Sequence, residues 1–445
     1  MNILIINGSP KGKNSITLQT CLYIKKHFPE HKYAVIQAGT MINKYEKDFG
    51  NAAGLINKAD LIIFSYPVYT FVAPSQLQRF VDLMIGHSQD GALNLKGKFA
   101  TQITTSKHFY DITAHRFIED NCKDMGMNII RGLSADMDDL TKESGRKDAI
   151  SFFSYVQHKI QAGRTLTESA EYTEVSEFPK YSDDTPLLSN ISVVADLAED
   201  DFKLKEMIDE FKSYCDDTVK IINIHDFAFK GGCISCFNCS GDGTCIYKDG
   251  FQELLRDEIQ TGQAIVLAFT IKNHSMGSVF KTYDDRQFCN GHRTVTMGMP
   301  FGYLINGNLS AESNLKTIIE ARAEVGGNYL AGVATNEYDY KSGVNELALD
   351  LKWCIDNKYT QPANFYGVGG MKIFRDLIFE MQGLMKADYK FFKANGQMDF
   401  PQKHPGKIAA MYLVGGMMNN QKIKSKIGSN MTDGMLLPYK NALKK

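Results

Sequence analysis

The chain has 445 residues, which is more than one hydrophobic core usually supports, so we expect two or three domains. Its 50 basic and 51 acidic residues nearly cancel, which argues against nucleic acid or an anionic membrane as a partner. No stretch reads as a signal peptide or a membrane span. The nine cysteines are odd in number and unevenly spaced, which is typical of a reducing compartment. We therefore expect a cytoplasmic protein that acts on small molecules.

Apolar runs alternate with helical patterns from the start of the chain to Ile160. A buried strand is expected at residues 3–6, followed by a polar loop and a helix that ends near Phe28. Later strands are expected in the apolar runs that begin at Ala59, Lys98 and Met127. Because strands and helices alternate, the pattern predicts an α/β fold with a doubly wound parallel sheet.

The second half of the chain repeats the first in three gapless blocks. The blocks begin at Asn190, Gly262 and Val325 and align with Asn2, Ala59 and Met125, at offsets of 188, 203 and 200 along the chain. Apolar strands resemble one another in any protein, but here the order, the spacing and the polar positions also agree. We expect a first domain at residues 1–160, a linker at 161–186, a second domain at 187–361 and a helical extension at 362–445.

The loop after the first strand, NGSPKGKNSIT, has the composition of an anion site. Gly8 and Gly12 permit a tight turn. Polar and basic side chains then surround the start of a helix, whose free N–H groups attract anions: Ser9, Lys11, Lys13, Asn14, Ser15 and Thr17. The pattern predicts a site for a phosphate monoester, and a capped turn without ligand is the alternative. The aligned loop of the second half would repel a phosphate, since it carries Asp196, Glu199, Asp200 and Asp201.

Four cysteines are clustered in one short segment of the second half, at Cys233, Cys236, Cys239 and Cys245. They lie between the first two blocks of the repeat, where its offset grows from 188 to 203, so the first half has no counterpart. Structural zinc sites usually combine two pairs of ligands from separate turns. Three cysteines at three-residue steps instead surround a compact group from one side, which favours a [4Fe-4S] cluster. Zinc, and redox-active thiols or disulfides, are the alternatives.

On these motifs the chain resembles the iron-sulfur flavoprotein branch of the NADPH-dependent FMN reductase family, which is flavodoxin-like. The phosphate-loop motif is matched from Gly8 to Ser15, and the compact cysteine motif from Gly232 to Cys245. The resemblance implies two tandem flavodoxin-like domains, each a three-layer α/β/α sandwich. It also implies FMN and a [4Fe-4S] cluster as cofactors. The family segment that lies against the flavin is matched at Pro67, Val68, Tyr69, Thr70 and Phe71.

The second half departs from the flavin-facing motif, with Thr270, Ile271 and Lys272 in its place. In the flavoproteins that this chain resembles, dimerisation brings the cluster of one subunit toward the FMN of the other. Here the two motifs are divided between the halves of one chain. We therefore expect one FMN in the first half, one cluster in the second, and an internal pseudo-dimer that is a monomer or a homodimer.

The loop after the fourth strand, TTSKHFYDITAH, is expected beside the flavin, because ligands of such folds bind at the carboxyl ends of the strands. Ser106 and Lys107 are candidates for contact with the cofactor. His108 and Tyr110 are the candidate proton donors of a reductase. The alternative is an ordinary surface loop.

The extension is rich in methionine and aromatic residues at helical spacing, and it ends a helix at Asn395 and Gly396. It is expected to pack as adaptable core or to form a lid over the flavin.

The whole pattern predicts an oxidoreductase that passes electrons through the cluster to FMN and on to a quinone, a nitro compound or an activated alkene. The donor is expected to be ferredoxin or NAD(P)H. The alternatives are an electron-transfer flavoprotein between redox proteins, an NAD(P)H-dependent FMN reductase, and a flavin-free zinc protein.

Overall fold

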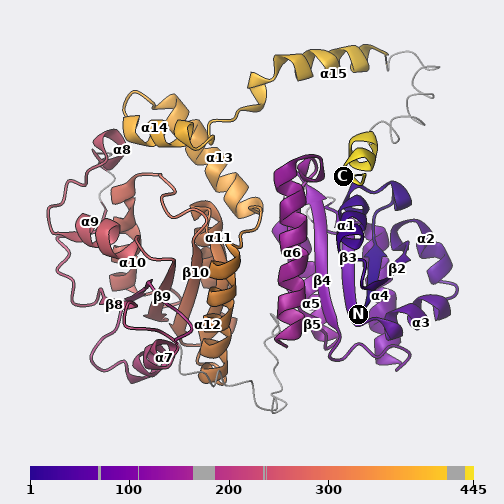
Figure 1. The fold of residues 1–445 in the computed structure, drawn as a ribbon, viewed down its shortest axis with the longest axis horizontal. Helices are drawn as coiled ribbons and strands as arrows, with labels where there is room; N and C mark the ends of the chain where they lie inside the picture. The colour runs from indigo at the N-terminus through magenta and orange to yellow at the C-terminus, as the bar shows by residue number, and fades with distance from the viewer. Residues whose placement is uncertain are drawn as a thin grey trace. The chain divides into compact units, whose positions relative to one another are not determined.

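The computed structural model describes residues 1–68, 72–108, 110–163, 186–233, 236, 238–417 and 436–444. The chain divides into two compact units, Met1–Tyr172 with Phe400–Lys445, and Thr173–Asp399. Each unit contains one parallel sheet with helices on both of its faces (Figure 1). The linker expected at 161–186 lies almost wholly outside the described residues, and the expected domain limits stay a prediction. No helix in the described ranges is both long and apolar enough to cross a bilayer.

The first sheet has the strand order β2-β1-β3-β4-β5, with β6 paired to β4. This order is that of flavodoxin-like sheets. Its strands are β1 (Asn2–Asn7), β2 (Lys32–Ile36), β3 (Leu61–Pro67), β4 (Phe99–Ser106), β5 (Asn128–Ile129) and β6 (Leu133–Asp136). All pairs are parallel, so the carboxyl ends of β1, β3 and β4 lie side by side at one edge.

Helices cover both faces of the first sheet. One face carries a core of alternate strand residues, among them Ile6 and Phe64, packed against α2 to α5. On the other side α1 contacts α6. The helices are α1 (Ile16–His27), α2 (Ala38–Tyr45), α3 (Gly50–Lys58), α4 (Ser75–Gln89), α5 (Asp111–Asp124) and α6 (Glu143–Gln161), with short 3-10 turns at η1 (Gly12–Asn14) and η2 (Asp139–Thr141).

The second sheet has the order β11-β10-β9-β7-β8, which is the same topology as the first. Its strands are β7 (Ile191–Ala195), β8 (Lys220–Asn223), β9 (Ala264–Thr270), β10 (Pro300–Asn306) and β11 (Tyr329–Thr335). The offset of 203 carries β3 onto β9 and the first residue of α4, Ser75, onto the first residue of α10, Ser278. The fold class expected from the sequence, two flavodoxin-like α/β domains, is therefore confirmed.

Helices and turns surround the second sheet, and the cysteines lie on its longest insertion, between β8 and β9. These elements are α7 (Phe202–Lys212), α8 (Asn238–Asp242), α9 (Phe251–Glu253), the π-helical η3 (Leu254–Ile259), α10 (Ser278–Arg286), η4 (Gln287–Asn290), η5 (Leu309–Ala311), α11 (Ser313–Gly326) and α12 (Tyr340–Asn357). Phe269 and Phe280 pack in the core between β9 and α10.

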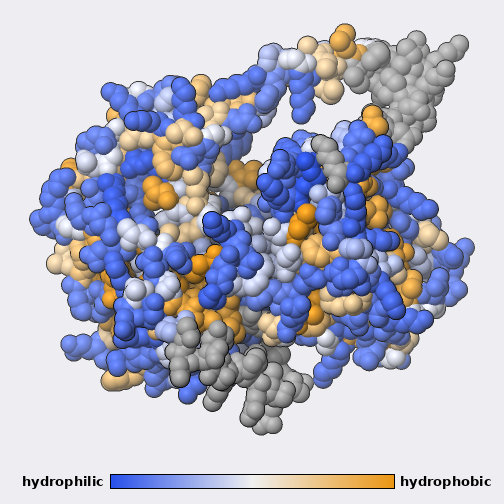
Figure 2. Space-filling model, viewed as in Figure 1, coloured by the Kyte–Doolittle hydropathy of each residue, from blue (hydrophilic) through white to orange (hydrophobic). Residues whose placement is uncertain are grey.

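The C-terminal extension forms separate helices. The helical spacing through Met385 predicts one helix, but the structure breaks it into α13 (Phe365–Glu380) and α14 (Lys386–Ala394). The second helix ends directly before Asn395, where the sequence predicts a stop. After η6 (Pro401–Lys403) comes α15 (Pro405–Met417), which carries exposed Met411, Tyr412 and Leu413. Figure 2 shows apolar colour along part of this helix, while the visible faces of both units are mostly hydrophilic.

Residues 436–442 form a last helical turn that belongs to the first unit. Leu436, Tyr439 and Ala442 are buried there. The Tyr439 hydroxyl donates to the carbonyl oxygen of Met137 at 2.6 Å, and Lys26 donates from Nζ to the carbonyl oxygen of Leu443 at 2.9 Å. The end of the chain is thus fixed to the first domain.

Candidate functional site

The loop between β1 and α1 is held in shape by Asn7, the last residue of the strand. Its Nδ2 donates to the carbonyl oxygen of Gly12 at 2.8 Å, and its Oδ1 accepts from the Ser9 N–H at 3.3 Å. Gly12 has φ +54°, in the left-handed region that favours glycine. Asn7 was missed in the sequence because an amide at a strand end has no motif of its own.

The predicted anion-site side chains gather at this loop, with different surroundings. Ser15 caps α1 by accepting from the Leu18 N–H at 3.3 Å, which uses one of the free N–H groups of the first turn. Thr17 is buried, with its Oγ1 only 2.6 Å from Oγ1 of Thr105 on β4. Ser9 is buried, whereas Lys11 and Asn14 are exposed. The remaining N–H groups of the turn and these exposed side chains are the ones suited to an anion.

Gly39 in α2 is a second residue that the sequence did not reveal. A Cβ atom at this position would lie 2.2 Å from the carbonyl oxygen of Ser9 and 2.6 Å from that of Gly8. The helix therefore presses directly on the backbone of the phosphate loop. A single glycine near a helix start gives no signal in the sequence, since the contact joins segments that are distant along the chain.

The segment expected against the flavin is described only in part. Pro67 ends β3, and the Val68 N–H donates to the carbonyl oxygen of Thr105 at 3.4 Å, so both lie beside the carboxyl end of β4. Tyr69, Thr70 and Phe71 lie outside the described residues.

His108 and Asp111 form a buried pair after β4. The His108 Nδ1 lies 2.9 Å from the Asp111 Oδ2, and Asp111 has no exposed surface. Ser106 Oγ accepts from the His108 N–H at 2.8 Å. His108 and Tyr110 have φ values of 60° and 56°, which are strained for residues with a side chain. Such strain, at the carboxyl edge of the sheet, is common at functional sites.

Lys107 points to a pair of carboxylates beside this loop. Its Nζ lies 2.7 Å from Asp136 and 3.2 Å from Asp138. Partial burial lowers the pKa of Lys107, but the two carboxylates raise it by a larger amount. The pKa of Lys107 is therefore above its usual value. The ammonium group therefore stays charged and already has partners.

His115 on α5 is buried beneath the same edge, with Nε2 2.9 Å from Thr104 Oγ1. Burial lowers its pKa to about 4, and of the nearby charges some oppose this shift while others add to it. Because the folded pKa lies below the unfolded value near 6.5, the neutral ring stabilises the fold at neutral pH, and this stability is lost as the pH falls from about 6.5 toward 4.

We expect a His115→Gln variant to lose that pH dependence. Between pH 7 and pH 4.5 the wild type should lose ~2 kcal/mol more in its free energy of unfolding than the variant does. Urea titrations at both pH values, followed by a probe in the first domain, measure the difference. Equal losses in both proteins would contradict the account.

In the second domain the corresponding loop is filled by its own carboxylate. Asp201 caps α7 by accepting from the Leu204 N–H at 3.2 Å. The same carboxylate accepts from Asn306 Nδ2 at 3.1 Å and from the Thr270 hydroxyl, at the ends of β10 and β9. Asp196 pairs with His225 Nδ1 at 2.7 Å. Where the first domain offers free donors, the second presents a satisfied network that carries negative charge.

The four predicted cysteine ligands line a single pocket of about 160 Å³ in the second domain. Cys239 lies on α8, while Cys233 and Cys236 precede it and Cys245 follows it. The other lining residues include Tyr247, Arg286, Phe288 and His292. Of the segment between Cys233 and α8, Ile234, Ser235 and Phe237 lie outside the described residues. Within the described ranges, no three Cys, His, Asp or Glu side chains meet as ligands of one ion.

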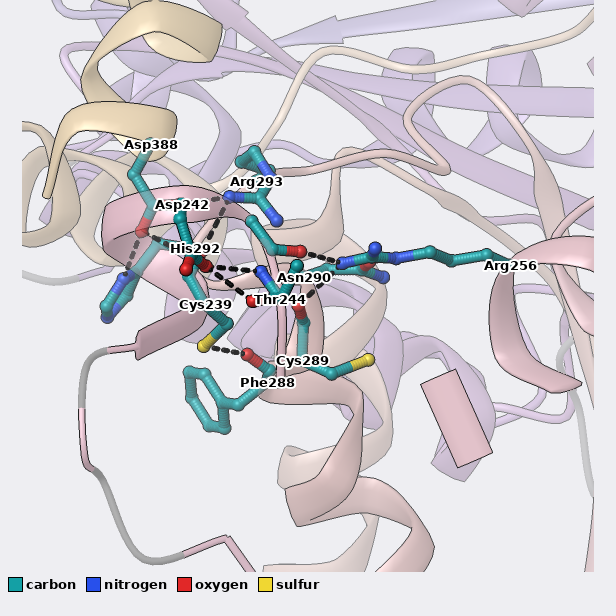
Figure 3. A network of polar contacts seen from close by, with 11 residues as sticks. Cys239, Asp242, Thr244, Arg256, Phe288, Cys289, Asn290, His292, Arg293 and Asp388 are labelled. Carbon is teal, nitrogen blue, oxygen red and sulfur yellow. Dashed lines mark hydrogen bonds and ion pairs between the residues drawn. The ribbon is translucent and has the colours of Figure 1, made fainter. Parts of the chain in front are cut away.

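Three arginines fasten the cysteine segment. Arg286 forms a two-pronged ion pair with Asp249 at 2.8 and 2.9 Å and donates to the carbonyl oxygen of Gly231 at 2.8 Å. Arg256 donates to the carbonyl oxygens of Gly243 at 2.7 Å and Cys289 at 2.8 Å (Figure 3). Arg293 donates to the carbonyl oxygen of Cys239 at 3.0 Å. The segment is thus held at its start, middle and end by cations.

A fifth cysteine, Cys289, lines the same pocket. It is buried, and burial raises its pKa to about 12, so it is a neutral thiol. Burial also raises the pKa of Cys239, whose Sγ donates to the carbonyl oxygen of Phe288 at 2.8 Å. The sequence places Cys289 close to His292 and Arg293, which allows a reactive thiol, but a lone cysteine more often packs in a core.

Comparison with known proteins gives a family match for the start of the chain and a curated relative. Residues 1–130 match the sequence model of the NADPH-dependent FMN reductase family. An iron-sulfur flavoprotein of Archaeoglobus fulgidus is 25% identical over 175 residues, which cover 37% of this chain and 78% of that protein.

Among solved structures, an apo NADH:FMN oxidoreductase covers 35% of this chain and 89% of its own, with 20% identity and a TM-score of 0.29. A flavodoxin from the domain Archaea covers 36% of this chain and 99% of its own, with 11% identity and a TM-score of 0.27.

Proposed function

We propose that this chain is an FMN-dependent oxidoreductase with a [4Fe-4S] cluster in its second domain, because residues 1–130 match the sequence model of the NADPH-dependent FMN reductase family. In this proposal electrons pass between the cluster and FMN and leave to a small organic acceptor. The observation that carries it is the gathering of Cys233, Cys236, Cys239 and Cys245 around one pocket.

The donors of the first domain fit FMN. The first turn of α1 has N–H groups beyond the one that Ser15 uses, and Lys11 and Asn14 stand exposed beside it. In the second domain Asp201 occupies the equivalent helix end and bonds across to β9 and β10. One FMN per chain follows from this contrast.

The cysteine pocket fits a group larger than one ion. Its volume of about 160 Å³ is several times that of the space one water needs, so it can enclose a group of several atoms. The donor set of four thiols is that of cubane clusters. In addition, Arg286 lines the pocket and its buried Nε has no hydrogen-bond partner in the described structure. An N–H donor without an acceptor suits an anionic cluster, whose sulfur atoms accept hydrogen bonds.

The two cofactors, when bound, supply the redox chemistry, the cluster by single electrons and the flavin by single electrons or a hydride. The chain's own residues position the acceptor and provide the proton. Asp111 holds His108 through Nδ1, which directs Nε2 to the opposite side of the ring. His108 is therefore the first candidate to carry a proton to the reduced acceptor, and Tyr110 is the second.

A Gly39→Ala substitution should weaken FMN binding at least about tenfold, because the new methyl group would displace the backbone of Gly8 and Ser9. Flavin titration of the apoprotein, followed by fluorescence quenching, measures the dissociation constant. Gly54→Ala in α3 is the matched control, since a Cβ there meets no atom within 4 Å. An unchanged affinity in the Gly39 variant would show that the phosphate loop does not bind the flavin.

Anaerobic turnover assays test the activity itself. The family match favours NADPH as the first donor to try, with reduced ferredoxin as the second. We expect at least one of them to support reduction of a quinone, a nitro compound or an activated alkene. If the reduced protein gives electrons to other redox proteins and to none of these small acceptors, the alternative of an electron-transfer flavoprotein is correct.

A further inference from the structure

Helix α14 of the C-terminal extension brings a fully buried carboxylate, Asp388, to the cysteine pocket (Figure 3). Its Oδ2 accepts from the His292 N–H at 3.0 Å and lies 2.9 Å from His292 Nδ1. Its Oδ1 accepts from Arg293 Nη1 at 2.9 Å. A carboxylate without exposure is costly unless it is paired in this way.

The same contacts reach the cysteines in one further step. Arg293 Nη1, which binds Asp388, also donates to the carbonyl oxygen of Cys239 at 3.0 Å. His292 lines the pocket, and its ring packs edge-on against Phe288 of the pocket at 5.7 Å and Phe374 of α13 at 4.9 Å. Arg293 thus joins the extension to Cys239, a predicted cluster ligand, and His292 joins the extension to the wall of the pocket.

Two glycines allow the backbone of the second domain to approach Asp388 and its helix closely. Gly291 has φ +63°, and a Cβ there would lie 2.3 Å from Asp388 Oδ1. Gly241 of α8 approaches the carbonyl oxygen of Leu384, which a Cβ would meet at 3.3 Å. The close approach of two separate segments at two glycines indicates a fixed arrangement, since any side chain at Gly291 would displace the carboxylate.

We propose that Asp388 is a positioning residue of the cluster site, so that residues 362–399 act as a wall of that site. Through Arg293 the carboxylate fixes the backbone of Cys239, and through His292 it fixes one side of the pocket. This inference rests on the proposed cluster. It goes beyond the four ligands by giving the first part of the C-terminal extension a role in holding them.

The Asp388 carboxylate also contributes a negative charge beside the pocket. Burial raises the pKa of Asp388, but the hydrogen bonds from His292 and the nearby Arg293 together lower it by a larger amount. The pKa is therefore below its usual value, and the carboxyl group is ionised. It balances Arg293, which would otherwise be an unpaired cation beside the cluster. Removing the negative charge should stabilise the more negative, reduced form and shift the midpoint potential of the cluster to a more positive value.

An Asp388→Asn variant tests this in the full-length protein. Loss of a residue that supports a ligand typically costs 10- to 100-fold in metal affinity, so we expect iron loss to a ferrous chelator to be at least about tenfold faster than in the wild type. The midpoint potential, followed by the cluster signal in EPR, should become more positive, and the FMN content should not change. Asp376→Asn is the matched control, because Asp376 on α13 is 42% exposed and pairs with Lys372 and Arg375.

The outcomes separate the two proposals. A wild type without iron overturns the proposed function. A wild type with iron, beside an Asp388→Asn variant with the same iron-release rate and potential, overturns only the role of Asp388. If the asparagine variant does not fold, Arg293→Gln removes the same link to Cys239; iron release should again be faster, whereas loss of the cation should shift the midpoint potential to a more negative value, and no change in either measurement overturns the role of Asp388.

Discussion

A Cys236→Ser variant should lose the cluster while it keeps one FMN per chain. Removing one of four ligands leaves an incomplete donor set, so the iron content is expected to fall from about four atoms per chain to below a tenth of that value. The proposed FMN site lies in the other domain, and none of its proposed residues lines the cysteine pocket. Iron and acid-labile sulfide analysis, together with flavin extraction, measures both cofactors.

Cys289→Ala is the matched control for this prediction. Cys289 lines the same pocket and is buried, but it stands outside the four-cysteine segment, so its variant should retain the full iron content. If instead the Cys236 variant keeps its iron and the Cys289 variant loses it, the assignment of the ligands is wrong. Loss of FMN together with the iron would contradict the division of cofactors between the domains.

An Arg286→Ala variant should unfold the cysteine segment and destabilise the second domain. The side chain is 1% exposed and holds Asp249, the Gly231 carbonyl and the face of the Tyr247 ring, which lies 4.3 Å from the guanidinium. Its removal leaves the buried Asp249 carboxylate uncompensated, which typically costs about 3–5 kcal/mol. Denaturant unfolding of the second domain gives the loss, and iron analysis should show an empty cluster site.

Arg286→Lys and Arg322→Ala make this prediction specific. Lysine keeps the charge but cannot form the two-pronged pair, so we expect an intermediate loss of stability. Arg322 forms an ion pair with Asp284 and is 38% exposed, so its removal should cost no more than about 1 kcal/mol. Similar losses for Arg286→Ala and Arg322→Ala would contradict the role of Arg286.

Titration of Asp249 should report the same ion pair. Asp249 has a pKa of about 2, held low mainly by its hydrogen bonds from Arg286. A carboxylate with a depressed pKa stabilises the fold above its unfolded pKa near 4, and this contribution is lost as the pH falls toward 2. This ion pair therefore contributes to the acid sensitivity of the second domain.

The succession of strands and helices in both domains could be predicted because it rests on local patterns. Apolar runs such as residues 61–67 are continuous, and the offset of 203 places the second run where β9 begins at Ala264. The cysteines gather around one pocket because they are close in sequence. The break between α13 and α14 was missed because helical spacing continues through residues that form a turn.

The supporting residues could not be predicted, since each acts across the chain. Asp388 reaches His292 over 96 residues, and Asp201 reaches Asn306 over 105. The sequence predicts that the acidic loop repels a phosphate, and the structure adds that the Asp201 carboxylate caps the helix start itself. The residue type alone makes His108 a candidate, whereas its pairing with Asp111 and its strained backbone are visible only in the fold.

The cofactor content of the purified wild-type protein tests the central claim most directly. Anaerobic purification, an absorption spectrum and counts of iron, zinc and flavin are sufficient. The account predicts about one FMN and four irons per chain, because Asp201 occupies the helix start of the second domain and the four cysteines line one pocket of that domain. Two flavins per chain, or zinc without iron, would contradict it.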